Sequence, residues 1–374
     1  MSERKRAGRN GNLELMRLVS MLLIVSYHYC IWGFFDEEII FSSNKLVVDL
    51  LCLYSWSGML LFVLLSGYYM VEGRYTIKKL LTMMGMIWFY TLGALLVFLV
   101  FHREMVDRRV VLDALFPLLR EHYWYMTYYT ALMLCTPFLN RLVHSLDRRQ
   151  HALLCLLSLL LCTGVPLIMD SLAGTTMVAF VALYFCAAYV RLHMAKEKRV
   201  GNRCLLLAGL FMLALGALVI SRDLAWQRSG NAEALLGSIA FICGMNKPPA
   251  LLLALLLLCG FACRPASDGG LLARLGSLTV GVYLFQSNGL ISLRIWQDVL
   301  HTRDFTLSPL MPLHAAGSLL AVFAVAMAIE SLRRRFVAPL WAKLVDRVAP
   351  PLESALDRLF DFLFALGRKI LNDE

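Results

Sequence analysis

Long apolar segments recur along the whole chain, separated by short polar stretches. A run of about twenty apolar residues is long enough to cross ~30 Å of hydrocarbon as a helix. Ten segments approach or reach that length, and they cover residues 15–35, 47–70, 80–101, 124–140, 151–170, 175–193, 204–220, 249–263, 275–292 and 313–332. The pattern predicts an all-α integral membrane protein, a bundle of about ten transmembrane helices.

Lysines and arginines gather in alternate connections between these segments. With ten spans, one side of the membrane receives all the strongly basic stretches: "SERKRAGRN", "GRYTIKK", "NRLVHSLDRR", "RLHMAKEKRVGNR" and "RRRF". Because cytoplasmic loops collect such residues, both termini are predicted to be cytoplasmic. The broken apolar stretch 233–245 is then part of an outer loop.

Three regions follow from this topology. Residues 1–14 form a basic cytoplasmic N terminus, residues 15–335 the ten-helix membrane domain, and residues 336–374 an amphipathic cytoplasmic tail. In the tail, apolar residues recur at helical spacing, which is typical of a helix that lies on membrane lipid.

The composition agrees with a membrane protein and gives no reason to expect nucleic acid or a metal ion as a partner. Of the 374 residues, 59% are hydrophobic and 17% are charged, so a multi-pass protein of the cell (inner or plasma) membrane is expected. The net charge of +10 is explained by the basic loops, so nucleic acid is not expected as a partner. The ten cysteines show no CxxC pair or metal-ligand spacing, so no metal site is predicted.

Two polar side chains in the first apolar segment need an explanation. Arg17 and His28 are eleven residues apart, close to three helical turns, so they share one helix face at a separation of ~16 Å. A charged residue within a span costs about 2.5–3.5 kcal/mol, which favours an interior, functional position. Glu14 lies one turn before Arg17, where the two can pair. The alternatives are an Arg17 that reaches the headgroups and a His28 that merely joins two helices.

Four motifs, in order along the chain, resemble the membrane-bound acyltransferase 3 family. They are the Arg and His separated by ten residues after "NLELM", then "LFVLLSGYYM" (61–70), "YWYMTYYTALMLCTPFLN" (123–140) and "LTVGVYLFQSN" (278–288). One departure is Gln286, which stands where members of the family often carry histidine.

The resemblance implies O-acyl transfer from cytoplasmic acyl-CoA to a hydroxyl of a surface or lipid-linked glycan. Acyl-CoA, with acetyl-CoA expected, is then a co-substrate, and no bound cofactor is expected. His28 and Arg17 are the catalytic candidates, with His28 as general base or acyl carrier. Basic residues at the cytoplasmic mouth are expected to bind the phosphates of acyl-CoA: Arg17, Arg74, Lys78 and Lys79. The positive-inside bias alone also explains the last three.

Further polar and aromatic residues are candidates for binding the acceptor or supporting the site. They are Glu14, Ser66, Trp124, Tyr125, Tyr283, Gln286 and Asn288. Close helix packing also explains Ser66, and an interfacial aromatic belt also explains Trp124 and Tyr125.

Two competing interpretations are less favoured. His102 and Asp107 have the His-x4-Asp spacing of another class of acyltransferase, but they fall in an outer loop, away from cytoplasmic acyl-CoA. A transporter or flippase without acyl-transfer chemistry would also place charges in its spans, yet the paired broken helices typical of such proteins are not evident.

Overall fold

Helices make up nearly all of the computed structural model, which describes residues 10–33, 42–73, 75–168, 176–194, 196–229 and 244–372; no strand occurs among them. The α-helices are α1 (Gly11–Trp32), α2 (Asn44–Leu53), α3 (Ser55–Met70), α4 (Ile77–Phe101), α5 (Arg108–Leu115), α6 (Trp124–Ser145), α7 (Arg148–Leu159), α8 (Val165–Ile168), α9 (Thr176–His193), α10 (Lys198–Ser229), α12 (Pro248–Ala262), α13 (Gly270–Gln286), α14 (Ser292–Arg294), α15 (Met311–Leu332) and α16 (Ala338–Asn372). Single π-helical turns cover Leu160–Gly164, Ile295–Val299 and Arg333–Val337.

The prediction of an all-helical, multi-span protein is confirmed at this level. Within the described ranges, six helical stretches are long and apolar enough to cross a membrane: Gly11–Trp32, Asn44–Met70, Ile77–Phe101, Thr176–His193, Lys198–Ala225 and Met311–Leu359. Pro248–Ala262 is a shorter apolar helix. Each of the ten predicted segments overlaps a helix, but the count of ten crossings and the cytoplasmic termini stay predictions. Most of the predicted outer-loop segment 233–245 lies outside the described residues.

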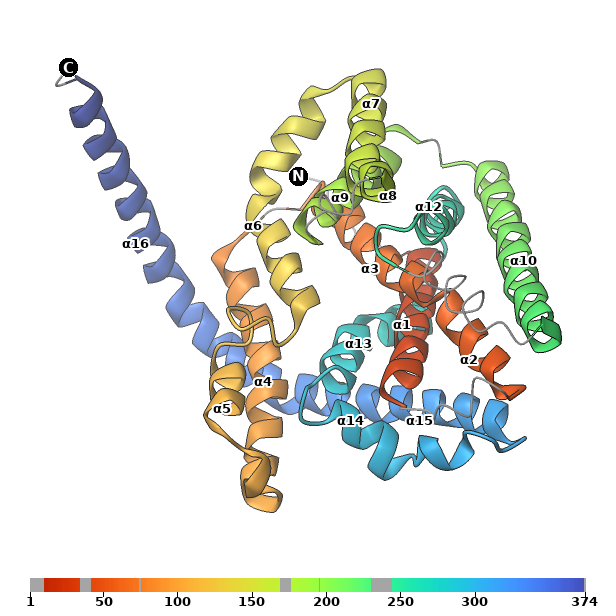
Figure 1. The fold of residues 1–374 in the computed structure, drawn as a ribbon. Coiled ribbons are helices and arrows are strands. Elements are labelled where there is room, and N and C mark those ends of the chain that lie inside the picture. Colours follow the sequence, from red (N-terminus) through yellow and green to blue (C-terminus); the bar gives the residue numbers. More distant parts are fainter. Residues whose placement is uncertain are drawn as a thin grey trace.

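Helix α1 lies near the middle of the bundle (Figure 1) and packs mainly against α3 and α13. Glycines allow both neighbours to approach it. A Cβ atom on Gly58 of α3 would lie 2.6 Å from Leu23 Cβ, and one on Gly276 of α13 would clash with Glu14 Oε2. Small residues at such crossings let membrane helices pack backbone against side chain. The polar residues of α1 therefore face other helices at close range.

The neighbours of α1 run in opposite directions. On α3, Tyr69 lies by Arg17 while Trp56 lies by Tyr27, so α3 is antiparallel to α1. On α13, Gly276 lies by Glu14 and Gln286 by His28, so α13 is parallel to α1. These are the directions that alternating first, second and ninth spans require.

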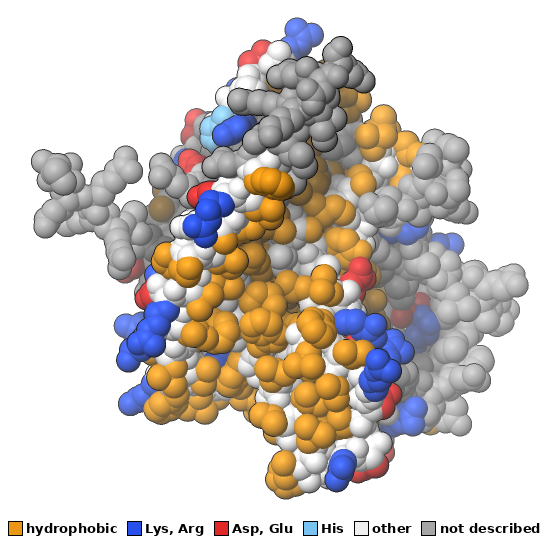
Figure 2. Space-filling model, turned by 90° about the vertical axis from the view of Figure 1, so that its left-hand side faces the viewer, with side chains coloured by type: hydrophobic (Ala, Val, Ile, Leu, Met, Phe, Trp, Pro, Cys, Tyr) orange, Lys and Arg blue, Asp and Glu red, His pale blue; other side chains and the backbone are white. Residues whose placement is uncertain are grey.

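The outer surface carries many apolar side chains. Figure 2 shows one face covered largely by hydrophobic side chains, with lysines and arginines mostly toward its margins. On α4, for example, Leu96, Val100 and Phe101 are 63–73% exposed. Since the hydrophobic effect disfavours such exposure to water, this surface is suited to lipid.

The last predicted span does not end at residue 332. The chain continues helically from α15 through the π turn Arg333–Val337 into α16, whose far end extends away from the other helices (Figure 1). Glu330 is fully buried there and accepts hydrogen bonds from Arg333 Nε and Nη2, each at 2.8 Å, and from Tyr90 of α4 at 2.9 Å. Arg333, the first arginine of the basic "RRRF" segment, therefore lies in a helix and pairs with a buried carboxylate, instead of lying in a loop.

We expect Glu330→Ala to lower the free energy of unfolding by about 3–5 kcal/mol, because it leaves the buried Arg333 charge without its partner. Denaturation in mixed detergent micelles measures this change. Lys78→Ala is the control: the Lys78–Asp346 ion pair is 59% and 57% exposed, so its loss is expected to cost ~1 kcal/mol or less. Equal effects of the two substitutions would contradict the conclusion that the buried Glu330–Arg333 ion pair stabilises the junction of α15 and α16.

Candidate active site

His28 lies inside the bundle, where α1 meets the end of α13. Its Nδ1 is 2.6 Å from Oε1 of Gln286, and the exposed fractions of the two residues are 9% and 0%. The ring also stacks on Trp32, one turn further along α1, with ring centroids 4.1 Å apart. Gln286, a candidate for supporting the site, thus contacts His28 directly, and the ring is held from two sides.

The hydrogen bond to Gln286 decides which nitrogen of His28 is basic. An amide oxygen only accepts, so Nδ1 must carry the proton that is donated to Oε1. In a neutral imidazole the other nitrogen, Nε2, then holds the lone pair. Gln286 Nε2 is buried without a hydrogen-bond partner among the described residues, which leaves an N–H donor close to the ring. The pair thus offers one base and one donor.

Arg17 lies further toward the N terminus of α1 and is 19% exposed. Its Nη1 is 3.3 Å from Glu14 Oε2, which confirms the predicted ion pair. The guanidinium also lies over the ring of Tyr69, 5.7 Å from its centroid. These contacts hold Arg17 against α1 and α3.

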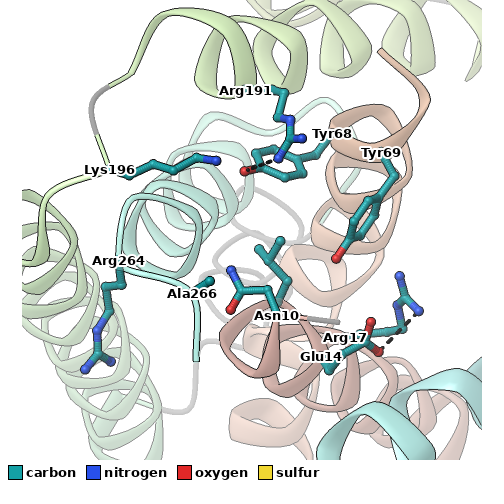
Figure 3. Close-up of a pocket in the computed structure, with 10 residues that line it drawn as sticks. Asn10, Glu14, Arg17, Tyr68, Tyr69, Arg191, Lys196, Arg264 and Ala266 are labelled. Atoms are coloured by element: carbon teal, nitrogen blue, oxygen red, sulfur yellow. Dashed lines mark hydrogen bonds and ion pairs between the residues drawn. The ribbon is translucent and has the colours of Figure 1, made fainter. Parts of the chain in front are cut away.

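A pocket of about 540 Å³ opens beside Arg17 (Figure 3). It is lined by Asn10, Leu13, Glu14, Arg17, Tyr68, Tyr69, Arg191, Lys196, Arg264 and Ala266. Four of these side chains are basic and Glu14 alone is acidic. The pocket therefore carries an excess of positive charge, which suits an anionic ligand.

Arg191 stands on the opposite wall from Arg17 and is also held in place. It donates a hydrogen bond of 3.1 Å to Tyr68 Oη and pairs with Glu72 (Figure 3 shows the bond to Tyr68). The hydrogen bond from Arg191 lowers the pKa of the Glu72 carboxyl below its usual value, so Glu72 stays charged and keeps the pair intact at neutral pH.

The predicted phosphate-binding residues are only partly brought together. Arg17 lines the pocket, whereas Lys78 pairs with Asp346 of α16, and neither Lys78 nor Lys79 is among the lining residues. Arg74 lies outside the described residues. Sequence reasoning missed Arg191, Lys196 and Arg264, since basic residues near helix ends are common on the cytoplasmic side and nothing in the sequence singles these out.

The predicted supporting residues of α3, α6 and α13 gather in one aromatic cluster. Ser66 Oγ lies 3.3 Å from Tyr125 Oη, and the Tyr125 ring packs edge-on against Tyr283 with centroids 5.5 Å apart. Trp124 packs edge-on against Tyr125. The cluster joins three helices, and its role in binding an acceptor stays a prediction.

Asn288 lies beyond the end of α13 and has a structural contact. Its Nδ2 donates to Tyr123 Oη at 3.0 Å, and Tyr123 Oη donates to the carbonyl of Leu284 at 2.8 Å. Asn288 also lines a second cavity of about 220 Å³ that includes His122. Asn288 therefore fixes the segment that follows Gln286.

The alternative His102–Asp107 pair does not form. His102 Nδ1 lies 3.5 Å from Glu104, while Asp107 caps α5 by accepting from the backbone N–H of Val110 at 2.8 Å. Within the described ranges, no group of three potential metal ligands occurs.

Comparison with known families gives a match over most of the chain. The acyltransferase 3 model, described as an acyltransferase domain, matches residues 10–331. Neither curated proteins nor solved structures yield a match. The matched range contains Arg17, His28, Gln286 and the basic pocket residues.

We expect nitrogen NMR of the ¹⁵N-histidine-labelled protein to show His28 protonated at Nδ1 and unprotonated at Nε2. The reason is that Gln286 Oε1 can only accept a hydrogen bond, and the ring nitrogen that faces it is Nδ1. The signal is assigned by its loss in His28→Ala. Gln286→Leu should yield a mixture of the two tautomers, whereas Ser66→Ala, which does not touch the ring, should leave the signal unchanged. An Nε2-protonated ring in the unaltered protein would contradict this assignment.

Proposed function

The chain belongs to the acyltransferase 3 family, and we propose that it is an O-acyltransferase that moves an acyl group from cytoplasmic acyl-CoA to a hydroxyl. The transferred acyl group is expected to be acetyl, and the acceptor is a surface or lipid-linked glycan. The observation that carries the proposal is the buried His28, held by Gln286 so that Nε2 is the basic nitrogen.

His28 as general base accounts for the reaction in one step. Nε2 takes the proton of the acceptor hydroxyl while that oxygen attacks the carbonyl carbon of the thioester. The C–S bond then breaks, and the coenzyme A sulfur leaves as a thiolate that receives the proton from the imidazolium. Throughout, Gln286 Oε1 stabilises the positive ring through Nδ1–H.

His28 as acyl carrier accounts for the reaction in two steps. Nε2 attacks the thioester carbon, the C–S bond breaks, and the thiolate leaves. The hydroxyl oxygen then attacks the acyl carbon, the C–N bond to His28 breaks, and the proton of the hydroxyl passes to the coenzyme A thiolate. Both routes use the same nitrogen, so the hydrogen bond to Gln286 serves either one.

The basic pocket fits the other end of the donor. Coenzyme A carries several phosphate charges, and guanidinium groups bind phosphate oxygens in pairs. Arg17 lies eleven residues before His28, which is ~16 Å along a helix. An extended pantetheine arm is long enough to cover this distance with the phosphates still in the pocket. The proposal therefore places donor binding by Arg17 and chemistry at His28 on one helix.

The acceptor is assigned to the half of the bundle beyond His28. The aromatic cluster of Trp124, Tyr125 and Tyr283 does not lie in that half: Tyr125 contacts Ser66, one turn before Tyr69, so the cluster lies between the levels of Arg17 and His28. The transporter alternative has no comparable support: the family match favours acyl-transfer chemistry, and no contact described above favours a carrier.

We expect His28→Ala to lower the turnover of the purified enzyme by at least ~10²-fold, because it removes the base or the acyl carrier. Ester content of the surface glycan, measured by mass spectrometry in cells that lack the gene and carry the variant, should fall to the level of cells without the gene.

His102→Ala is the matched control, since His102 pairs with Glu104 away from His28, and its activity should survive. Wild-type turnover in His28→Ala would exclude His28 from the chemistry. Unaltered glycan in cells without the gene would instead exclude the glycan as acceptor and leave the role of His28 standing.

A further inference from the structure

The four basic residues of the large pocket differ in how their charges are used. Arg17 pairs with Glu14, and Arg191 pairs with Glu72. Lys196 and Arg264 also line the pocket, but neither forms an ion pair within the part of the chain that the structure describes. Neither cation is thus held by a carboxylate in an ion pair, although Lys196 is close enough to Glu72 to help lower the pKa of that carboxyl.

The two kinds of cation also lie in different parts of the pocket. Arg17 and Arg191 belong to the helices α1 and α9, next to Tyr69 and Tyr68 of α3. Lys196 follows the end of α9 at His193, and Arg264 follows the end of α12 at Ala262. Figure 3 shows Lys196 and Arg264 on the side of the pocket opposite Arg17. The unpaired cations thus stand at the rim of the pocket. Asn12 Nδ2 donates to the carbonyl of Pro265, which places Arg264 near the first turn of α1, further from His28 along that helix than Arg17 is.

This order matches the order of groups along coenzyme A. Starting from the thioester, the molecule continues with pantetheine, the diphosphate and finally the ribose with its 3′-phosphate. If the thioester reaches His28 and the diphosphate lies by Arg17, the 3′-phosphate falls at the rim. A phosphate monoester carries a charge of about −1.5 to −2, which two unpaired cations balance.

We propose that Lys196 and Arg264 bind the 3′-phosphate of coenzyme A and make the enzyme specific for 3′-phosphorylated donors. The inference rests on the proposed function, since it assumes that acyl-CoA occupies this pocket. The pocket then has two parts: Arg17 and Arg191 bind the diphosphate, and Lys196 and Arg264 bind the 3′-phosphate. The two rim residues then set donor specificity without touching the reacting atoms.

Titration calorimetry of the full chain in nanodiscs of uncharged phosphatidylcholine tests the division, with coenzyme A and 3′-dephospho-coenzyme A as probes. We expect coenzyme A to bind at least about tenfold more tightly than the dephospho form, as a charge-assisted contact to one phosphate provides. In the double variant Lys196→Ala, Arg264→Ala, this ratio should fall to about one while the affinity for the dephospho form is unchanged.

Two further variants separate the parts of the pocket. Arg17→Ala should weaken both probes alike and keep their ratio, whereas Arg203→Ala, which removes an exposed cation of α10 outside the pocket, should change neither. A double variant that still discriminates, or a wild-type protein that does not, would overturn the inference. Discrimination that disappears in anionic-lipid nanodiscs would assign the two cations to lipid headgroups instead. A wild-type protein that binds neither probe would overturn the proposed function itself.

Discussion

A polar group inside an apolar bundle must find a partner, and the close approach of α1 to α3 and α13 supplies those partners. Gly58 and Gly276 remove the side chains that would hold these helices apart. Because α13 runs parallel to α1 at this distance, Gln286 reaches His28 while Gly276 leaves room for Glu14. An unsatisfied histidine at this depth would cost free energy comparable to a lost hydrogen bond. The same packing therefore stabilises the bundle and orients the imidazole.

Much of this could be predicted from the sequence because it depends on periodicity along single helices. The shared face of Arg17 and His28, and the pair of Glu14 with Arg17, follow from 3.6 residues per turn. The resemblance of "GVYLFQSN" to a family motif pointed to Gln286, although the family often has histidine there. An amide in its place keeps the hydrogen bond but cannot take up a proton, so His28 is the one titratable member of the pair.

What the sequence did not reveal depends on contacts between distant segments. Lys196 and Arg264 are 68 residues apart and come together only because α9 and α12 end beside the same pocket. Glu330 illustrates the same limit: the sequence indicates a basic loop after residue 332, whereas Arg333 folds back on a buried carboxylate that Tyr90 also binds. Charge counting assigns residues to a side of the membrane, but it does not distinguish a free cation from one that is already paired.

The account predicts a path across the membrane: the donor enters at the basic pocket, the acyl group passes to His28, and the acceptor receives it beyond. Sealed vesicles of known orientation test this most directly, with radiolabelled acetyl-CoA added to one face at a time. Transfer of label should occur only when the donor is on the face that bears the N terminus and the basic pocket. Equal use of donor from both faces would contradict the account.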